Sequence, residues 1–168
     1  GQTLSAATQH ELGCGMTELK AGVVGAGVFG GYHAHKYAAL SGVTLVGVLD
    51  ADPGRGGALA EKLGARAFTD TDAFFDGLDV VTIAAPASAH AELAAKALER
   101  GVHVYVEKPI ALTVAGAQAL VALAEARGLV LACGHQERAI FRAMGLLDAP
   151  ETPVRIEAVR RSSYYPGR

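Results

Sequence analysis

The stretch GVVGAGVFGG, residues 22–31, holds five glycines in ten positions directly behind a short apolar run. Each glycine costs up to about 1 kcal/mol relative to alanine inside regular structure, because it loses more backbone freedom on folding. A turn that keeps so many glycines needs backbone with no side chain in the way. Gly25, Gly27 and Gly30 form the pattern Gly-x-Gly-x-x-Gly between a predicted strand and a predicted helix. This context predicts a loop that binds a dinucleotide diphosphate.

Each glycine of the pattern has a separate predicted task. The first allows the tight turn, the second lets the backbone approach the diphosphate, and the third lets helix and strand pack closely. The amides of Val28 and Phe29 complete the predicted site, because unpaired N–H groups and the helix dipole favour negative charge there. Asp50 ends the next predicted strand, where a carboxylate accepts hydrogen bonds from the adenosine ribose. The alternative interpretation is a tight turn beside a solvated aspartate.

Asp50 also bears on the choice of cofactor. Its carboxylate would repel a 2′-phosphate, so NAD is predicted over NADP. Arg55 follows five residues later and is able to pair with that phosphate instead, which keeps NADP as the alternative cofactor.

From residue 19 onward, short apolar runs alternate with longer helical stretches. Strands are predicted at 19–24, 43–49, 65–68, 80–84, 102–106 and 130–133, and helices at 28–40, 56–63, 70–75, 88–100, 113–127 and 139–147. The strand runs are continuous in Val, Ile and Leu, which is typical of strands covered on both faces. Ser88 and Thr113 are expected to cap their helices. The predicted fold class is α/β, a Rossmann-type doubly wound parallel sheet with only the start of a second α+β domain.

The sequence predicts three parts of the chain. Residues 1–15 lack the basic and apolar regions of a secretory signal and are expected to be a disordered leader or cloning remnant. Residues 16–148 are predicted to form the dinucleotide-binding domain. Residues 149–168 are expected to be a linker and the first strand of a truncated substrate domain.

The composition limits the class of protein. Half of the residues are hydrophobic, and the net charge of −2 lacks a basic stripe, so no nucleic acid partner is expected. No apolar run approaches the roughly 18 residues of a membrane span, so no membrane partner is expected either. The two cysteines, Cys14 and Cys133, form neither a metal cluster nor a disulfide framework. A reduced, cytoplasmic location and no metal site are predicted.

Three further motifs are present: VEKP at 106–109, APASAH at 85–90 and GHQER at 134–138. With the glycine pattern in register, the chain from about Leu19 to Arg161 resembles the glucose-fructose oxidoreductase/inositol dehydrogenase/MocA family. The resemblance implies an NAD(P)-dependent dehydrogenase that transfers hydride between nicotinamide and a hydroxyl of a sugar, cyclitol or nucleotide-sugar. It also implies a second, open-faced sheet domain that binds substrate. A homo-oligomer is expected, because a normally covered apolar face favours self-association.

Lys108 is the predicted catalytic residue. A lysine between a strand end and a proline is held at the carboxyl edge of the sheet, where ligands bind in such folds. Its ammonium can donate to a substrate hydroxyl and stabilise alkoxide character while hydride leaves. Glu107 is predicted to orient it, both residues are expected to contact the cofactor, and the resemblance implies a cis bond between Lys108 and Pro109. The alternative is an ordinary surface lysine.

Further contacts are expected on either side of this motif. Ala84 and Pro86 are predicted to contact the cofactor, and the resemblance implies the same for His90, near the nicotinamide or the substrate. A packing histidine is the alternative for His90. Family members usually carry Thr-Pro-Asn where this chain has Ala85-Pro86-Ala87, so cofactor contacts there fall to the backbone.

The GHQER motif supplies the predicted substrate ligands. His135 and Arg138 follow the last strand, and an arginine there can bind a carboxylate or phosphate through its planar fork. The motif is similar to that of members that oxidise the 3-hydroxyl of UDP-N-acetylglucosamine-type sugars, with an ordinary surface pair as the alternative. His33, His35 and His103 are interpreted as packing or surface histidines.

The sequence is compatible with two functions of different classes. The first is the sugar or nucleotide-sugar oxidoreductase, and the second is a catalytically silent, NAD-responsive binding or regulatory protein. The family's second-domain motif Asp-x-x-x-His does not follow Arg161. The 168-residue chain alone is therefore expected to bind NAD weakly and to show no turnover.

Overall fold

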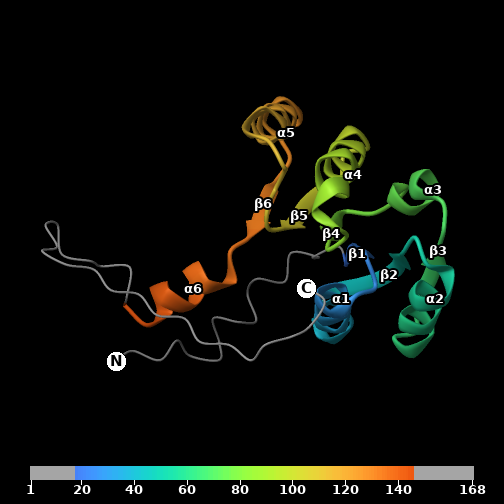
Figure 1. The fold of residues 1–168 in the computed structure, drawn as a ribbon. Coiled ribbons are helices and arrows are strands. Elements are labelled where there is room, and N and C mark those ends of the chain that lie inside the picture. Colours follow the sequence, from blue (N-terminus) through green and yellow to red (C-terminus); the bar gives the residue numbers. More distant parts are fainter. Residues whose placement is uncertain (1–17, 146–168) are drawn as a thin grey trace, which may run out of the picture. The chain divides into compact units, whose positions relative to one another are not determined.

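The computed structural model describes residues 18–145, drawn in colour in Figure 1. This part of the chain separates into two compact units, with the division after Gly134. The expected leader at 1–15, the linker and strand at 149–168, and the predicted domain boundary at 148 all lie outside the described residues.

The first unit alternates strands and helices as expected for an α/β fold. The strands are β1 (Leu19–Val24), β2 (Val43–Leu49), β3 (Arg66–Phe68), β4 (Val80–Ile83), β5 (His103–Glu107) and β6 (Leu131–Gly134). The helices are α1 (Val28–Ala39), α2 (Pro53–Lys62), α3 (Thr71–Phe75), α4 (Ala87–Glu99) and α5 (Val114–Arg127).

All six strands form one parallel sheet in the order β3-β2-β1-β4-β5-β6, the order of a Rossmann fold. Helices α1 and α2 cover one face, and α3, α4 and α5 cover the other (Figure 1). This confirms the predicted doubly wound α/β sheet. Because the strands are parallel, their carboxyl ends meet at one edge, which carries the loops discussed below.

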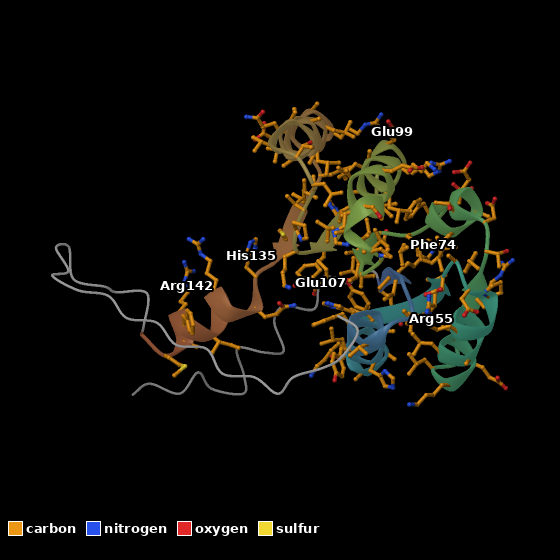
Figure 2. All side chains as sticks on the ribbon, in the orientation of Figure 1. Arg55, Phe74, Glu99, Glu107, His135 and Arg142 are labelled. Atoms are coloured by element: carbon orange, nitrogen blue, oxygen red, sulfur yellow. The ribbon has the colours of Figure 1, made fainter. Side chains whose placement is uncertain are left out.

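The larger core lies on the face covered by α3, α4 and α5. Phe74 and Phe75 of α3 are each 1% exposed and pack with buried valines of β5 and with Leu98 of α4. Figure 2 labels Phe74 within this layer. Burying one such side chain contributes roughly 1.5–3 kcal/mol. This layer therefore holds β5 in place, and the predicted catalytic loop follows β5.

Helix ends account for the differences from the predicted bounds. Helix α2 begins three residues before the predicted start, because the Asp52 carboxylate accepts from the amides of Gly54 and Arg55 at 2.9 and 3.2 Å. The prediction that Ser88 caps its helix was wrong: Pro86 occupies the N-cap of α4, and no side chain caps this end. Thr113 does cap α5, since its hydroxyl accepts from Gly116 N at 3.1 Å.

The second unit contributes one described helix, α6 (Gln136–Ala143), which begins three residues before its predicted start. Ile140 and Phe141 lie on this helix, and Met144 follows it in the sequence. About half or more of the surface of each of these three residues is exposed. Among residues 18–145, no helix is long and apolar enough to cross a membrane.

Candidate functional site

The candidate site lies at the carboxyl edge of the sheet, at the point where the strand order reverses. Strand β1 lies between β2 and β4, so the loops after β1 and β4 diverge and leave a crevice at the carboxyl edge. A cavity of about 580 Å³ occupies this place. It is lined by Val24, Gly25, Gly27, Leu49, Asp50, Ala51, Arg55, Thr69, Thr71, Ala84, Ala85, Pro86, Ala89 and Leu93.

The glycine turn forms one wall of this cavity, and each of its glycines has a different environment. Gly25 adopts a left-handed φ of +96°, and a Cβ atom there would lie 2.5 Å from the Ala84 carbonyl oxygen. A Cβ on Gly30 would lie 1.7 Å from the Gly25 carbonyl oxygen, so α1 packs against the turn at a distance that only glycine permits. Nothing lies within 4 Å of a Cβ placed on Gly27, which leaves open space beside the backbone.

Asp50 stands at the end of β2, and its carboxylate gathers four donors. Oδ2 accepts from Ala26 N at 2.6 Å and from Arg55 Nε at 3.2 Å. Oδ1 accepts from Asp52 N at 2.7 Å and from Arg55 Nη2 at 2.7 Å. Asp50 therefore ties the glycine turn to the start of α2, and Arg55, labelled in Figure 2, covers it from the solvent side. A ribose hydroxyl that binds this carboxylate competes with Arg55.

These contacts predict how the fold responds to acid. Burial by itself raises the pKa of Asp50, but the hydrogen bonds from Arg55, Ala26 and Asp52 outweigh it and hold the pKa below its ordinary value of 3.8. A lowered pKa stabilises the fold above pH 3.8, and this contribution is lost as the pH falls through the lower, folded-state value.

Asp50→Asn should therefore flatten the acid limb of the unfolding free energy below about pH 4. Urea unfolding measured across this pH range checks the expectation. Asp76→Asn, at an exposed carboxylate 3.8 Å from Arg100, serves as the matched control for the loss of one carboxylate. Equal slopes for the parent and Asp50→Asn would contradict the role assigned to Asp50.

The Glu-Lys-Pro motif follows β5, the strand beside β4. Glu107 is the last residue of β5 and is 7% exposed, whereas Lys108 is exposed. The Lys108–Pro109 peptide bond is cis, as the resemblance implied. The motif does not line the cavity itself but stands on the loop next to it, because β4 and β5 pair along their length.

His33 supplies the partner of Glu107 that sequence reasoning missed. Its Nε2 lies 3.0 Å from Glu107 Oε1, and its ring contacts Tyr105 at 5.2 Å between centroids. The interaction joins α1, which begins at the glycine turn, to the end of β5; Figure 2 labels Glu107 at this place. The contact spans 74 residues of sequence, so only the close packing of α1 on the sheet reveals it.

Removing this contact should lower stability. His33→Ala takes one partner from a buried carboxylate, which is expected to cost about 1–3 kcal/mol in the free energy of unfolding. His35→Ala on the same helix is the matched control, because His35 is exposed and its Nδ1 lies 2.7 Å from Gly31 O of its own helix. Urea unfolding of both variants checks the difference. Equal losses would show that the His33–Glu107 contact contributes nothing.

The face of the sheet beneath α1 carries further polar groups near Glu107. Tyr37 Oη lies 2.9 Å from Thr82 Oγ1, and burial raises the pKa of Tyr37 despite this hydrogen bond. Burial, followed by the charge of Glu107, raises the pKa of Tyr105. Both phenols therefore stay protonated at neutral pH and add no negative charge to the layer that holds Glu107.

His90 is buried and is not among the residues that line the cavity. Only 2% of its surface is exposed, and both ring nitrogens lie close to backbone carbonyl oxygens of Ala85 and Pro109. These contacts favour the packing alternative over direct contact with a ligand. Of the other predicted residues, Gly25, Gly27, Asp50, Ala84 and Pro86 line the cavity together.

The predicted substrate ligands belong to the second unit. His135 is the N-cap residue of α6, and both His135 and Arg138 are exposed. Their role toward a substrate stays a prediction.

The fold and the cavity together define a class of protein, a Rossmann domain with a glycine turn and an acidic residue at the end of β2. Comparison with known families identifies it further. Residues 19–135 match the model of the GFO_IDH_MocA oxidoreductase family, NAD-binding Rossmann fold. The chain belongs to this family, whose model describes an NAD-binding Rossmann fold.

Known relatives include enzymes acting on sugars and cyclitols. Over 123 residues the chain is 42% identical to UDP-N-acetylglucosamine 3-dehydrogenase of Acidithiobacillus ferrooxidans, covering 73% of this chain and 39% of the relative. A solved structure of that enzyme matches with a TM-score of 0.71 at 39% identity, covering 76% of this chain and 44% of that one.

Two other relatives extend the range. Inositol 2-dehydrogenase 1 of Saccharopolyspora erythraea is 37% identical over 71% of this chain and 37% of its own length. The structure of GenD2 from gentamicin A biosynthesis, in complex with NAD, matches with a TM-score of 0.69 at 38% identity, over 80% of this chain and 37% of that one. The chain thus spans about two fifths of the length of the relatives it matches.

Proposed function

We propose that this chain is the cofactor-binding part of a dehydrogenase that transfers hydride between NAD and a hydroxyl of a sugar, cyclitol or nucleotide-sugar. One observation carries the proposal. A cavity bounded by the glycine turn and Asp50 reaches Ala84 and Pro86, directly beside the loop that carries Lys108. The proposed dinucleotide site and the candidate catalytic group thus lie at the same edge of the sheet.

The cavity fits a dinucleotide on its own geometry. The open space beside Gly27 has room for a diphosphate, which the amides of Val28 and Phe29 would hold at the start of α1. Asp50 would hold the adenosine ribose, with Arg55 displaced or turned toward the adenosine. When bound, NAD supplies the nicotinamide that accepts or returns a hydride. Ala84 and Pro86 line the far part of the cavity and would contact it.

Lys108 is proposed to act on the substrate hydroxyl. Its ammonium is exposed on the loop after β5, so it is accessible to a substrate above the sheet edge. There it would donate a hydrogen bond to the hydroxyl oxygen and stabilise the negative charge that develops on it. Glu107 would hold the strand end beneath it through His33.

The proposed substrate class rests on similarity to one of the relatives named above. The 42% identity to UDP-N-acetylglucosamine 3-dehydrogenase supports a nucleotide-sugar whose 3-hydroxyl is oxidised. In this proposal His135 and Arg138 belong to the substrate site, where the guanidinium would pair with a phosphate oxygen of the nucleotide.

We test this proposal with the complete protein that the gene encodes. NAD reduction is followed by absorbance with UDP-N-acetylglucosamine, myo-inositol and unmodified hexoses as substrates, and NAD and NADP affinities are measured by calorimetry. We expect turnover with a nucleotide-sugar and tighter binding of NAD than of NADP. Asp50→Ala should weaken NAD binding about tenfold or more, since a charged hydrogen-bond partner is lost.

A second candidate function is an NAD-responsive regulatory protein without catalysis. It is favoured by one feature, the Ala85-Pro86-Ala87 stretch, whose side chains offer no hydrogen-bonding groups to a nicotinamide. NAD binding without turnover on any of these substrates would select it.

A further inference from the structure

We propose that His90 is a positioning residue whose ring ties the loop after β4 to the loop after β5, and so holds Lys108 beside the cofactor cavity. The inference rests on the proposed function, because it assigns a further task within the same site. It departs from a direct contact between His90 and the cofactor.

The contacts of His90 join the loop after β4 to the loop after β5. Nδ1 lies 2.7 Å from the Pro109 carbonyl oxygen, and Nε2 lies 2.8 Å from the Ala85 carbonyl oxygen. Ala85 lines the cavity, and Pro109 directly follows Lys108. A single buried side chain therefore connects the cavity wall to the residue next to the candidate catalytic lysine.

The place of His90 in the fold makes this connection rigid. The residue lies in the first turn of α4, whose inner face packs into the larger core through Ala94, Ala97 and Leu98. A side chain with 2% exposure has little freedom to change rotamer. Because His90 is held firmly in α4, the two loops that it contacts are held in place relative to this helix.

The chemistry of the two contacts sets a condition on the ring. Both partners are carbonyl oxygens, which accept hydrogen bonds and do not donate them. A ring with one N–H can donate to only one of them, and the bare nitrogen would then face a lone pair. Each ring nitrogen lies within hydrogen-bond distance of its carbonyl, and the tautomer of the ring decides which nitrogen donates.

Lys108 then stands between two anchored neighbours. On one side, Glu107 contacts His33 of α1 at 3.0 Å. On the other, the Pro109 carbonyl is held by His90 of α4. The backbone of Lys108 is thus fixed from both faces of the sheet, while its side chain stays exposed. Such fixation matters because small misplacements of a reacting group cost large factors in rate.

Two variants separate the two anchors. His90→Asn places an amide nitrogen near the position of Nδ1, and His90→Gln places one near the position of Nε2, so each retains one anchor. His90→Phe removes both. In the gene product as the cell makes it, we expect kcat to fall about tenfold or more in the single-anchor variants and further in His90→Phe, while the NAD dissociation constant changes less than about threefold.

His103→Asn is the matched control. His103 lies at the other end of β5, where Nδ1 accepts from Val130 N at 3.0 Å, so its replacement changes a backbone contact far along the strand from Lys108. Its kcat should match that of the parent. Unchanged kcat in His90→Phe, with the fold intact, would overturn the proposal.

Two measurements need no activity. Hydrogen exchange of the 168-residue chain should become faster at 84–89 and at 107–112 in His90→Phe, and unchanged exchange in both segments would overturn the proposal. Long-range ¹H–¹⁵N spectra of the parent should show a ring N–H of His90 in slow exchange with solvent, and rapid exchange would overturn the proposal.

The two proposals can fail separately. If the parent shows no turnover but the exchange and spectra behave as expected, the proposed function fails and the tie between the loops stands. If Lys108→Ala abolishes turnover while every His90 variant keeps it, the tie fails and the proposed function stands.

Discussion

Gly30→Ala should destabilise the domain by about 3 kcal/mol or more and abolish NAD binding. The added Cβ would lie 1.7 Å from the Gly25 carbonyl oxygen, a backbone atom that cannot turn aside. Either α1 moves away from the turn or the turn itself opens, and both changes disturb the amides that would hold the diphosphate. Urea unfolding and calorimetric titration with NAD measure the two effects.

Two neighbouring glycines provide controls with opposite expectations. Gly27→Ala places its Cβ in open space, so stability should stay within about 1 kcal/mol of the parent, while NAD affinity falls because the methyl occupies the diphosphate position. Gly31→Ala also meets nothing within 4 Å and lies inside α1, so stability should rise by about 0.5–1 kcal/mol with binding unchanged. Normal NAD affinity in Gly27→Ala would place the diphosphate elsewhere.

Lys108→Ala should lower kcat by about 10²- to 10⁴-fold in the gene product as the cell makes it, with NAD affinity retained. The cavity residues that would hold the dinucleotide do not include Lys108, so its removal leaves the binding surface intact. Because Lys108 is exposed, stability should change by less than about 0.5 kcal/mol. Steady-state kinetics and calorimetry distinguish loss of catalysis from loss of binding.

A second substitution separates charge from proton transfer. Lys108→Arg keeps the positive charge but cannot give up a proton, so partial activity would assign Lys108 an electrostatic task and full loss a proton-transfer task. Lys96→Ala is the matched control, since Lys96 is a lysine of α4 that pairs with Glu92 at 2.8 Å, outside the residues that line the cavity. Full activity of Lys108→Ala would refute the proposed catalytic role of Lys108.

Much of the fold could be predicted because its signals are local. The predicted bounds of β1 and β2 match the observed ones, because short runs rich in Val and Leu indicate strands without reference to their neighbours. The helix starts were less predictable. Helix α2 begins earlier than the apolar pattern indicated, because Asp52 caps it and Pro53 is its first residue. In α4 the N-cap residue is Pro86 and not the predicted Ser88.

The sequence by itself determined the glycine turn, the acidic residue after β2 and the Glu-Lys-Pro motif, because each depends on residues close together in the chain. Only the tertiary structure decided that Arg55 covers Asp50, that His33 contacts Glu107 and that His90 joins Ala85 to Pro109. The last two contacts connect different elements of the parallel sheet. In such a sheet every strand returns to the same edge, so groups far apart in sequence meet there, and no local pattern records which of them pair.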